Sequence, residues 1–420
     1  MLVFKFGGAS VKDADGVRNL SKIVRLYQNE NIVIVVSAMA KTTNALEILN
    51  SEYIAKSDTT SLLLDQLKEF HFNIARQLFP NDSHPVFNIL EKHFRELENF
   101  LARDPALNFD FNYDQIVSFG ELLSTSIVAG YLKNEGLQAE WKDIRHSLKT
   151  DGSYREGKVD WELSGELIRK DFQFSNAQFL ITQGFLGSTI NNLTTTLGRE
   201  GSDYSAAILA YVLDAGKVII WKDVPGVLNA DPKWFDNTEL LPQLSYLDAI
   251  ELAYYGASII HPKTIQPLRN KNINLHVKSF LHPDEPGTII GNEVYEKLVP
   301  SFIFKMDQVL INISAKDFSF IAEDNLEVIF HAFAARKLRI NLMQNTAMNF
   351  KVCVNNDKTR IPGVLTILED HFRIAVEEGL ELITIRYFDN HTIDRVLVNK
   401  EPLLQQISRE TIQMVVKDKG

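Results

Sequence analysis

The sequence predicts an α/β protein with a mainly parallel β-sheet sandwiched by helices, followed by a smaller ferredoxin-like α+β unit. Two observations lead to this prediction. In the first two thirds of the chain, short runs that are apolar on both faces alternate with segments of helical periodicity. After about Val299 the segments become shorter and follow a βαββαβ order, which is typical of a ferredoxin-like unit.

The first three elements form a predicted βαβ unit. LVFKFG from Leu2 ends at glycines, ADGVRNLSKIVRLYQ has helical spacing, and NIVIVVSA is too apolar to be an exposed strand. Further buried strands are expected at AQFLITQGF from Ala177 and KVIIWKD from Lys217. Ligands of such sheets bind beyond the carboxyl ends of the strands. We therefore expect KFGGAS, VSAMAKTTN, TQGFLG and WKDVPG to converge on one crevice.

A helical insertion and a change of pattern define the remaining organisation. Ser61 to Leu101 is rich in Leu, Phe, Glu and Lys, and we expect helices over the crevice edge or at a subunit contact. Prolines and a glycine in FLHPDEPGTII break the pattern. The predicted domains are 1–297 and 298–420, with a complete βαββαβ pattern at about 306–388 and a truncated second unit at about 389–420 that holds a helix and a terminal strand.

The composition is that of a globular protein, because the 420 residues are 45% hydrophobic and 23% charged. A formal net charge of -10 gives no basic field, so neither nucleic acid nor a membrane is expected as a partner. No apolar stretch approaches the roughly 20 residues that span a bilayer, and no signal region precedes the first strand. The sole cysteine, Cys353, and the lack of a zinc-type Cys/His cluster favour a cytoplasmic protein without a metal site.

KFGGAS is the first candidate for chemistry. Backbone N–H groups of Gly7 and Gly8 can bind phosphate oxygens, and Lys5 can neutralise charge on a transferring phosphoryl group. The alternative is a turn without a ligand. The spacing matches neither the Walker pattern nor the dinucleotide fingerprint.

TTTLGREGSDYSAAILAYVL is the second candidate. Its polar first half leads into an apolar-periodic helix, so Ser202 and Asp203 are expected at the helix N-terminus with exposed backbone donors. Arg199 suits a bidentate grip on a carboxylate or phosphate. Asp203 could organise lysine side chains or a magnesium nucleotide. The alternative is a capped helix with a solvated arginine.

Six motifs follow one another in order between Lys5 and Thr264: KFGGAS, VVSAMAKTTN, SFGELLST, TTTLGREGSDYSA, WKDVPGVLNADPK and YYGASIIHPKT. With them the chain closely resembles the aspartate kinases of the amino acid kinase family. The resemblance implies an amino acid kinase domain followed by ACT-type regulatory domains. It also implies a reaction in which ATP phosphorylates the β-carboxylate of L-aspartate, the first step of lysine, threonine, methionine and diaminopimelate synthesis.

The resemblance also implies roles for single residues. Catalysis falls to Lys5, Asp203 and Arg199, with Mg²⁺ brought by the ATP. The implied aspartate ligands are Ser37, Thr43, Glu121, Arg199 and Ser202. The implied nucleotide ligands are Lys5, Gly7, Gly8, Ser10, Lys222, Asp223, Lys233 and Ser258. Each has a structural alternative: Glu121 could pair with an arginine, and the hydroxyls of Ser37 and Thr43 could cap a helix. His261 is expected to be structural.

The nucleotide side departs from the family pattern. Ala9 stands where a threonine is usual, and Lys222, Leu228 and Lys233 stand where the family has threonine, tyrosine and arginine. Ser258 replaces a lysine that the family places near the phosphates. We expect Lys222 or Lys263 to restore that charge from another direction.

The tail carries the expected regulation. By resemblance, a lysine or threonine effector would contact Asn325, Asn341, Gln344 and Asn345, although polar turns and sheet edges explain these residues equally well. INISA could pair edge to edge with another chain, so a homodimer through the ACT region is expected. Two other functions stay open: a regulatory homologue that has lost nucleotide chemistry, and a kinase for glutamate, N-acetylglutamate or a nucleoside monophosphate.

Overall fold

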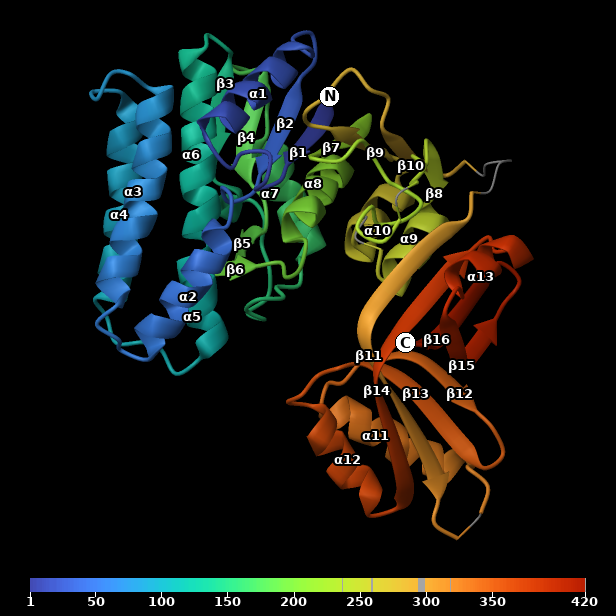
Figure 1. Cartoon of the computed structure of the whole chain (residues 1–420). Helices are drawn as coiled ribbons and strands as arrows, with labels where there is room; N and C mark the ends of the chain where they lie inside the picture. The colour runs from blue at the N-terminus through green and yellow to red at the C-terminus, as the bar shows by residue number, and fades with distance from the viewer. Residues whose placement is uncertain (236, 258–259, 294–298, 318, 420) are drawn as a thin grey trace. The chain divides into compact units, whose positions relative to one another are not determined.

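The computed structural model describes residues 1–235, 237–257, 260–293, 299–317 and 319–419. The chain forms two compact units (Figure 1), each described here by itself. The first comprises Met1–Val227, Leu240–Ile250 and Ile259–Tyr295, and the second Leu228–Glu239, Glu251–Ser258 and Glu296–Gly420. Two short stretches of the predicted first domain therefore belong to the second unit. The predicted boundary at 297 and 298 lies outside the described residues.

The first unit contains an eight-stranded sheet in the order β3-β4-β2-β1-β7-β9-β10-β8. Neighbouring strands are parallel, except that β10 runs antiparallel to β9. The strands are β1 (Leu2–Phe6), β2 (Ile32–Val36), β3 (Ala139–Lys142), β4 (Phe179–Gln183), β7 (Lys217–Lys222), β8 (Gln243–Ser245), β9 (Asn274–Ser279) and β10 (Thr288–Gly291). The predicted, mainly parallel sheet is confirmed. A separate antiparallel hairpin consists of β5 (Leu186–Ser188) and β6 (Thr194–Thr196).

Helices cover both faces of this sheet. Successive strand residues point to opposite faces: the Phe4 ring packs edge-on against Tyr27, which follows α1, whereas Lys5 contacts Asp203 of α8. The helices are α1 (Ala14–Arg25), α2 (Thr42–Ile54), α3 (Thr60–Leu78), α4 (Pro85–Leu101), α5 (Phe109–Val117), α6 (Phe119–Asn134), α7 (Trp161–Asp171), α8 (Gly201–Val212), α9 (Tyr246–Tyr255, divided between the units) and α10 (Pro262–Asn270), with the short 3₁₀ helix η1 (Ile144–His146).

The predicted helical insertion is confirmed as α3 and α4, which lie side by side next to α6 (Figure 1). Buried apolar residues of α4, including Leu90, Phe94 and Leu97, recur at helical spacing and fix its inner face. Within the described residues, no helix combines the length and the apolarity that a membrane span requires.

The second unit contains a six-stranded antiparallel sheet in the order β12-β13-β11-β14-β16-β15. Its elements are β11 (Ser301–Ala315), α11 (Glu323–Ala335), β12 (Ile340–Asn345), β13 (Asn349–Asn355), α12 (Ile361–Glu369), β14 (Phe372–Arg386), α13 (Asn390–Val396), β15 (Lys400–Ile407) and β16 (Thr411–Asp418). Ile329 of α11 and Val364 of α12 share one buried core with the sheet residues Ile311 and Val352. The predicted βαββαβ order is confirmed over β11 to β14.

Two expectations for the second unit need correction. After β14 the chain adds a helix and two strands, not one, and both strands extend the same sheet. The INISA segment, Ile311–Ala315 of β11, is not an edge: it is bonded to β14, and most of it also to β13. Its alternating apolar residues face the core of the unit itself, so pairing with another chain would fall to β12 or β15.

Candidate active site

The carboxyl ends of the central strands meet through backbone hydrogen bonds. Ser37 N donates to Phe6 O at 3.1 Å and Ala40 N to Gly8 O at 3.0 Å, which joins the ends of β1 and β2. Gly184 N donates to Val36 O at 3.1 Å and joins β4 to β2. On the other side, the buried Ser10 hydroxyl lies 3.4 Å from Trp221 O of β7. The four predicted segments therefore converge at one edge of the sheet.

Close backbone approach explains the glycines at this edge. A Cβ atom on Gly8 would lie 2.6 Å from Ala38 O, and one on Gly120 would lie 2.9 Å from the Ala38 side chain. A Cβ on Gly184 would lie 2.4 Å from the Cβ of Ser202. These positions tolerate no side chain without a shift of the backbone, so glycine brings β1, β2, α6 and the start of α8 together.

Lys5 and Asp203 form an ion pair at the centre of the edge. Lys5 Nζ lies 2.6 Å from Asp203 Oδ1, and the two side chains are 12% and 5% exposed. Nζ also lies over Gly7, since a Cβ there would be 3.5 Å from it. The absence of a side chain at Gly7 therefore keeps the approach to the ammonium group open.

Arg199 lies on the turn that leads into α8. Gly198 and Glu200 adopt left-handed backbone conformations with φ of 81° and 54°, and Asp203 N donates to Glu200 O at 3.1 Å. Arg199 is exposed between them, whereas Ser202 and Asp203 are buried in the first turn of α8. The turn thus presents a guanidinium group beside a helix N-terminus, where backbone N–H groups and the helix dipole favour anions.

Glu121 is a buried carboxylate in the first turn of α6. Its Oε1 accepts a hydrogen bond from Ala38 N at 3.2 Å, while Oε2 has no hydrogen-bond partner among the described residues. Burial raises the pKa of Glu121 to about 8, although the Ala38 N–H and the charge of Lys5 act to lower it. A buried carboxyl oxygen without a donor is destabilising, because its hydrogen bonds to water are lost on folding.

Ser37 and Thr43 flank the loop between β2 and α2, and both are half-buried. Ser37 O accepts a hydrogen bond from Ser124 of α6 at 2.7 Å. The N-cap residue of α2 is Lys41, and no side chain caps that helix. The capping alternative for these two hydroxyls is therefore wrong.

Known proteins resemble this chain over most of its length. The model of the Amino acid kinase family matches residues 1–279. The chain belongs to this family. Its relative lysine-sensitive aspartokinase 3 of Escherichia coli (strain K12) is 31% identical over 407 residues, which cover 92% of this chain and 86% of the relative.

Solved structures extend the similarity to both units. E. coli aspartokinase III in complex with aspartate and ADP has a TM-score of 0.82 and 26% identity, covering 99% of this chain and 96% of that one. The same enzyme in complex with lysine and aspartate has a TM-score of 0.81 and 26% identity. The predicted resemblance to aspartate kinases is confirmed, and this member of the amino acid kinase family is a nucleotide-using kinase that acts on aspartate.

The other residues expected to bind the nucleotide lie in separate segments of the chain. Lys222 is the last residue of β7 and Asp223 follows it; Lys222 O accepts a hydrogen bond from Phe280 N at 2.6 Å. Lys233 is exposed and belongs to the second unit, so it is not placed relative to Lys5. Ser258 lies outside the described residues. His261 caps α10 by accepting from Lys263 N at 3.1 Å, which confirms its structural role.

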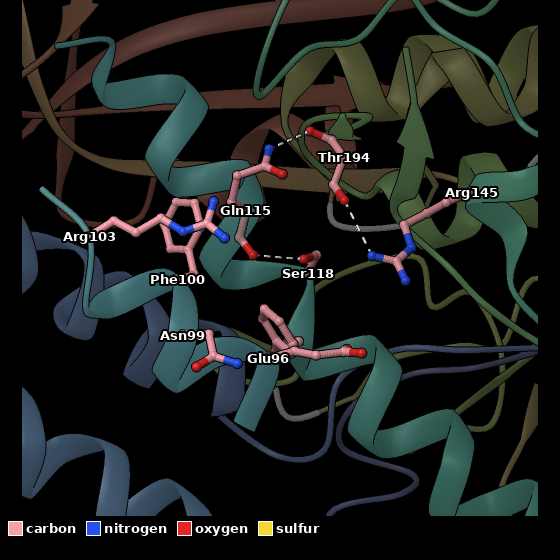
Figure 2. A pocket seen from close by; sticks show the side chains of 9 residues that line it. Glu96, Asn99, Phe100, Arg103, Gln115, Ser118, Arg145 and Thr194 are labelled. Atoms are coloured by element: carbon pink, nitrogen blue, oxygen red, sulfur yellow. Dashed lines mark hydrogen bonds between the residues drawn. The ribbon is translucent and has the colours of Figure 1, made fainter. Parts of the chain in front are cut away.

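A cavity of about 310 Å³ opens beside this site in the first unit (Figure 2). Its lining residues are Glu96, Asn99, Phe100, Arg103, Gln115, Ser118, Phe119, Arg145 and Thr194. Gln115 Nε2 donates to Thr194 O at 2.8 Å, and the Arg145 guanidinium donates to Thr194 Oγ1 at 3.3 Å (Figure 2). Arg145 also forms a bidentate pair with Asp143. These bonds hold the start of β6 against α5 and η1.

The effector candidates lie in the second unit in unlike settings. The Asn341 amide accepts from Lys305 Nζ and donates to Gln308 and Asn355, so it is engaged on both sides. Asn325 Oδ1 accepts from Ala322 N at the start of α11. Gln344 and Asn345 lie on β12, at the edge of the sheet.

Sequence reasoning missed several residues that shape the site. Gly184 lies in TQGFLG, but its close packing on Ser202 depends on a contact with another motif. The buried Asp114 of α5 has no local signal, since its partners Arg155 and Thr196 are 41 and 82 residues away. The polar strand TTT gives no apolar pattern, so the β5–β6 hairpin was not expected either.

Proposed function

We propose that phosphoryl transfer from ATP to the β-carboxylate of L-aspartate takes place between Glu121 and the Lys5–Asp203 pair. The observation that carries this proposal is the buried Oε2 of Glu121, which has no donor among the described residues. The ammonium group of aspartate supplies both the missing donor and the missing charge. Its binding favours the ionised form of Glu121, whose pKa burial raises.

Arg199 binds the α-carboxylate of aspartate in this proposal. A guanidinium group binds a carboxylate through two parallel hydrogen bonds, and Arg199 is exposed beside the N-terminus of α8. Ser37, Thr43 and Ser202 add hydrogen bonds from neighbouring segments. With the two ends of the amino acid fixed, the β-carboxylate points toward Lys5.

Lys5 stabilises the phosphoryl group during transfer, and Asp203 holds Lys5 in place through the 2.6 Å ion pair. The glycine backbone at Gly7 and Gly8 leaves room for phosphate oxygens, and Ser10 ties this loop to β7. A carboxylate is a nucleophile at neutral pH, so no general base is required. Catalysis then rests on alignment and charge stabilisation.

Mg²⁺ enters this site with ATP. Among the described residues no group of three or more His, Cys, Asp or Glu side chains could hold a metal ion. In this proposal the cation is bound mainly by phosphate oxygens and water. Lys222, Asp223, Lys233 and Ser258 stay proposals for the nucleotide, with Lys222 best placed because it ends the strand next to β1.

Lysine is the effector we propose, because the E. coli relative is named lysine-sensitive and a similar structure contains lysine. Gln344 and Asn345 are the favoured contacts, since Asn341 is engaged by its neighbours. A homodimer through the sheet edge of the second unit and a cytoplasmic location complete the proposal.

The decisive experiment traps the acyl phosphate with hydroxylamine after incubation with Mg-ATP and L-aspartate, with L-glutamate as control. Aspartyl hydroxamate from aspartate alone is the expected result. Lysine and threonine are titrated in parallel, and inhibition by lysine alone is expected. A folded protein that binds aspartate without forming product would instead support the regulatory homologue.

A further inference from the structure

Asp114 of α5 is a fully buried carboxylate outside the proposed ligand set. Its Oδ2 accepts from Arg155 N and Thr196 N, both at 2.9 Å, and its Oδ1 accepts from Thr196 Oγ1 at 2.7 Å. Burial raises the pKa of Asp114 to about 6, and these three donors act in the opposite direction. The donors are two backbone N–H groups and one hydroxyl, none of them charged, so the carboxylate anchors the Arg155 loop and the end of β6.

Thr196 is the last residue of β6 and lies three residues before Arg199. The chain continues with Leu197 N donating to Phe185 O at 2.9 Å, and it enters α8 after four residues of turn. Gln115 and Arg145 hold the other end of β6 at Thr194, as Figure 2 shows. Asp114 therefore fixes the end of β6 that faces the turn.

Arg155 gives Asp114 a second connection to the same turn. The Arg155 N–H donates to Asp114, while a Cβ on Gly198 would lie 3.1 Å from Arg155 O. The backbone of Arg155 thus contacts the Asp114 carboxylate through its N–H and lies beside the left-handed Gly198 with its carbonyl oxygen. Both connections end within one to three residues of Arg199.

We infer that Asp114 is a positioning residue, which sets the place of the turn that presents Arg199 and Ser202 to the substrate. The inference rests on the aspartate-binding role proposed for Arg199. It predicts that loss of the Asp114 carboxylate lowers the affinity for aspartate but not for ATP. The reason is that Asp114 contacts β6, which leads to Arg199, and not the glycine loop after β1.

The test compares Asp114→Asn with Asp110→Asn in the full-length enzyme. Asp110 lies one turn earlier on α5, is half-exposed and pairs with the Arg155 side chain, so it controls for the lost charge. Asp114→Asn is expected to raise KM for aspartate roughly tenfold, with KM for ATP within about twofold. Asp110→Asn is expected to leave both constants within about twofold.

A second variant, Thr196→Val, serves if Asp114→Asn does not fold. It removes one of the three hydrogen bonds to Asp114 and is expected to raise KM for aspartate by a smaller factor than Asp114→Asn does.

A double variant separates this inference from the function on which it rests. In an Arg199→Ala background, Asp114→Asn is expected to raise KM for aspartate by a clearly smaller factor than in the wild type, because the main substrate contact that it positions is gone. If Arg199→Ala alone leaves KM unchanged, the role proposed for Arg199 fails and this inference fails with it. If Arg199→Ala raises KM but Asp114→Asn does not, or if Asp114→Asn raises KM for ATP equally, positioning by Asp114 alone is refuted.

Discussion

Lys5 and Lys149 are both largely buried lysines of the first unit, and they use their ammonium groups differently. Lys149 Nζ donates to Arg145 O, Ser188 Oγ and Asn192 Oδ1 at 3.0, 2.9 and 3.0 Å, and burial lowers its pKa. In the described part of the chain, the Lys5 ammonium group contacts one charged group, Asp203, in an ion pair. An ammonium group has three N–H donors. Lys149 has used all three, whereas Lys5 is engaged by this ion pair.

This difference separates a structural lysine from a reactive one. The neutral acceptors around Lys149 join η1 to the β5–β6 region and leave no donor for a ligand. The carboxylate of Asp203 pairs with Lys5 on one side, and Gly7 lies beside its Nζ without a side chain. Burial alone would not distinguish Lys5 from Lys149, but the number of ammonium N–H groups that are already engaged does.

The sharpest test of this comparison replaces each lysine by methionine, which keeps the aliphatic stem. Lys5→Met is expected to lower kcat roughly 100- to 1,000-fold, because a charge aimed at the transition state is lost, and also to lower thermal stability, because the buried Asp203 carboxylate loses its cation. Lys149→Met is expected to remove three hydrogen bonds, one of them to the buried hydroxyl of Ser188, and to cost roughly 1–3 kcal/mol of stability. Hydroxamate formation and thermal unfolding measure the two effects.

The distinction between a reactive Lys5 and a structural Lys149 is wrong if the two variants show each other's effects on activity and stability. A Lys149→Met enzyme that is fully stable but inactive would place Lys149 in the chemistry. A Lys5→Met enzyme with normal kcat would remove Lys5 from phosphoryl transfer and leave the ion pair with Asp203 as a structural contact.

Glu121 is the acidic counterpart of Lys5: its side chain is buried, and its Oε2 accepts no hydrogen bond from the described residues. Glu121→Gln is expected to raise KM for aspartate at least roughly 30-fold, because the ammonium group loses its counter-charge. The folded-state pKa of Glu121 is raised to about 8 from 4.5, so the wild type loses stability as the pH rises through this window. Glu121→Gln escapes this loss and is expected to gain stability relative to wild type between pH 5 and 8.

Thermal unfolding at a series of pH values checks the sign of this effect. Glu166→Gln on α7, where the carboxylate is exposed, serves as the control and should follow the wild type at every pH. Saturating aspartate should raise the melting temperature of the wild type much more than that of Glu121→Gln. A stability difference that is constant with pH would mean that the Glu121 carboxylate is compensated within the protein.

The sequence predicts the local parts of this site well and its long-range parts poorly. KFGGAS and GREGSD are contiguous, so their strand end and helix N-terminus can be inferred from pattern alone. The Glu121 contact with Ala38 joins residues 83 apart, and the bonds of Lys149 to Ser188 and of Asp114 to Thr196 cross 39 and 82 residues. A single sequence contains no signal for such pairs, so the structural lysine and the carboxylate anchor emerged only from the fold.

Access to Lys5 depends on the glycine loop, which gives a third and smaller effect. Gly8→Ala would place a methyl group 2.6 Å from Ala38 O, and we expect a loss of roughly 1–3 kcal/mol together with a higher KM for ATP. Gly152→Ala is the control, since nothing lies within 4 Å of its Cβ position, and it should change stability by less than about 0.5 kcal/mol. Equal melting temperatures for the two variants, measured by calorimetry, would show that the β1 loop can move away from β2.

Lys222 is a further candidate for a reactive lysine. Comparing the effects of its substitution on activity and on stability can assign it to the structural or the reactive class. It ends β7, next to β1, where it could supply the charge that Ser258 does not. Lys222→Met is then expected to raise KM for ATP roughly three- to tenfold while KM for aspartate stays within about twofold. Lys217→Met is the matched control, because Lys217 begins the same strand, about 16 Å from Lys222 at the rise of a β-strand. If Lys222→Met changes stability but not KM for ATP, Lys222 belongs with Lys149, and the missing charge must come from elsewhere.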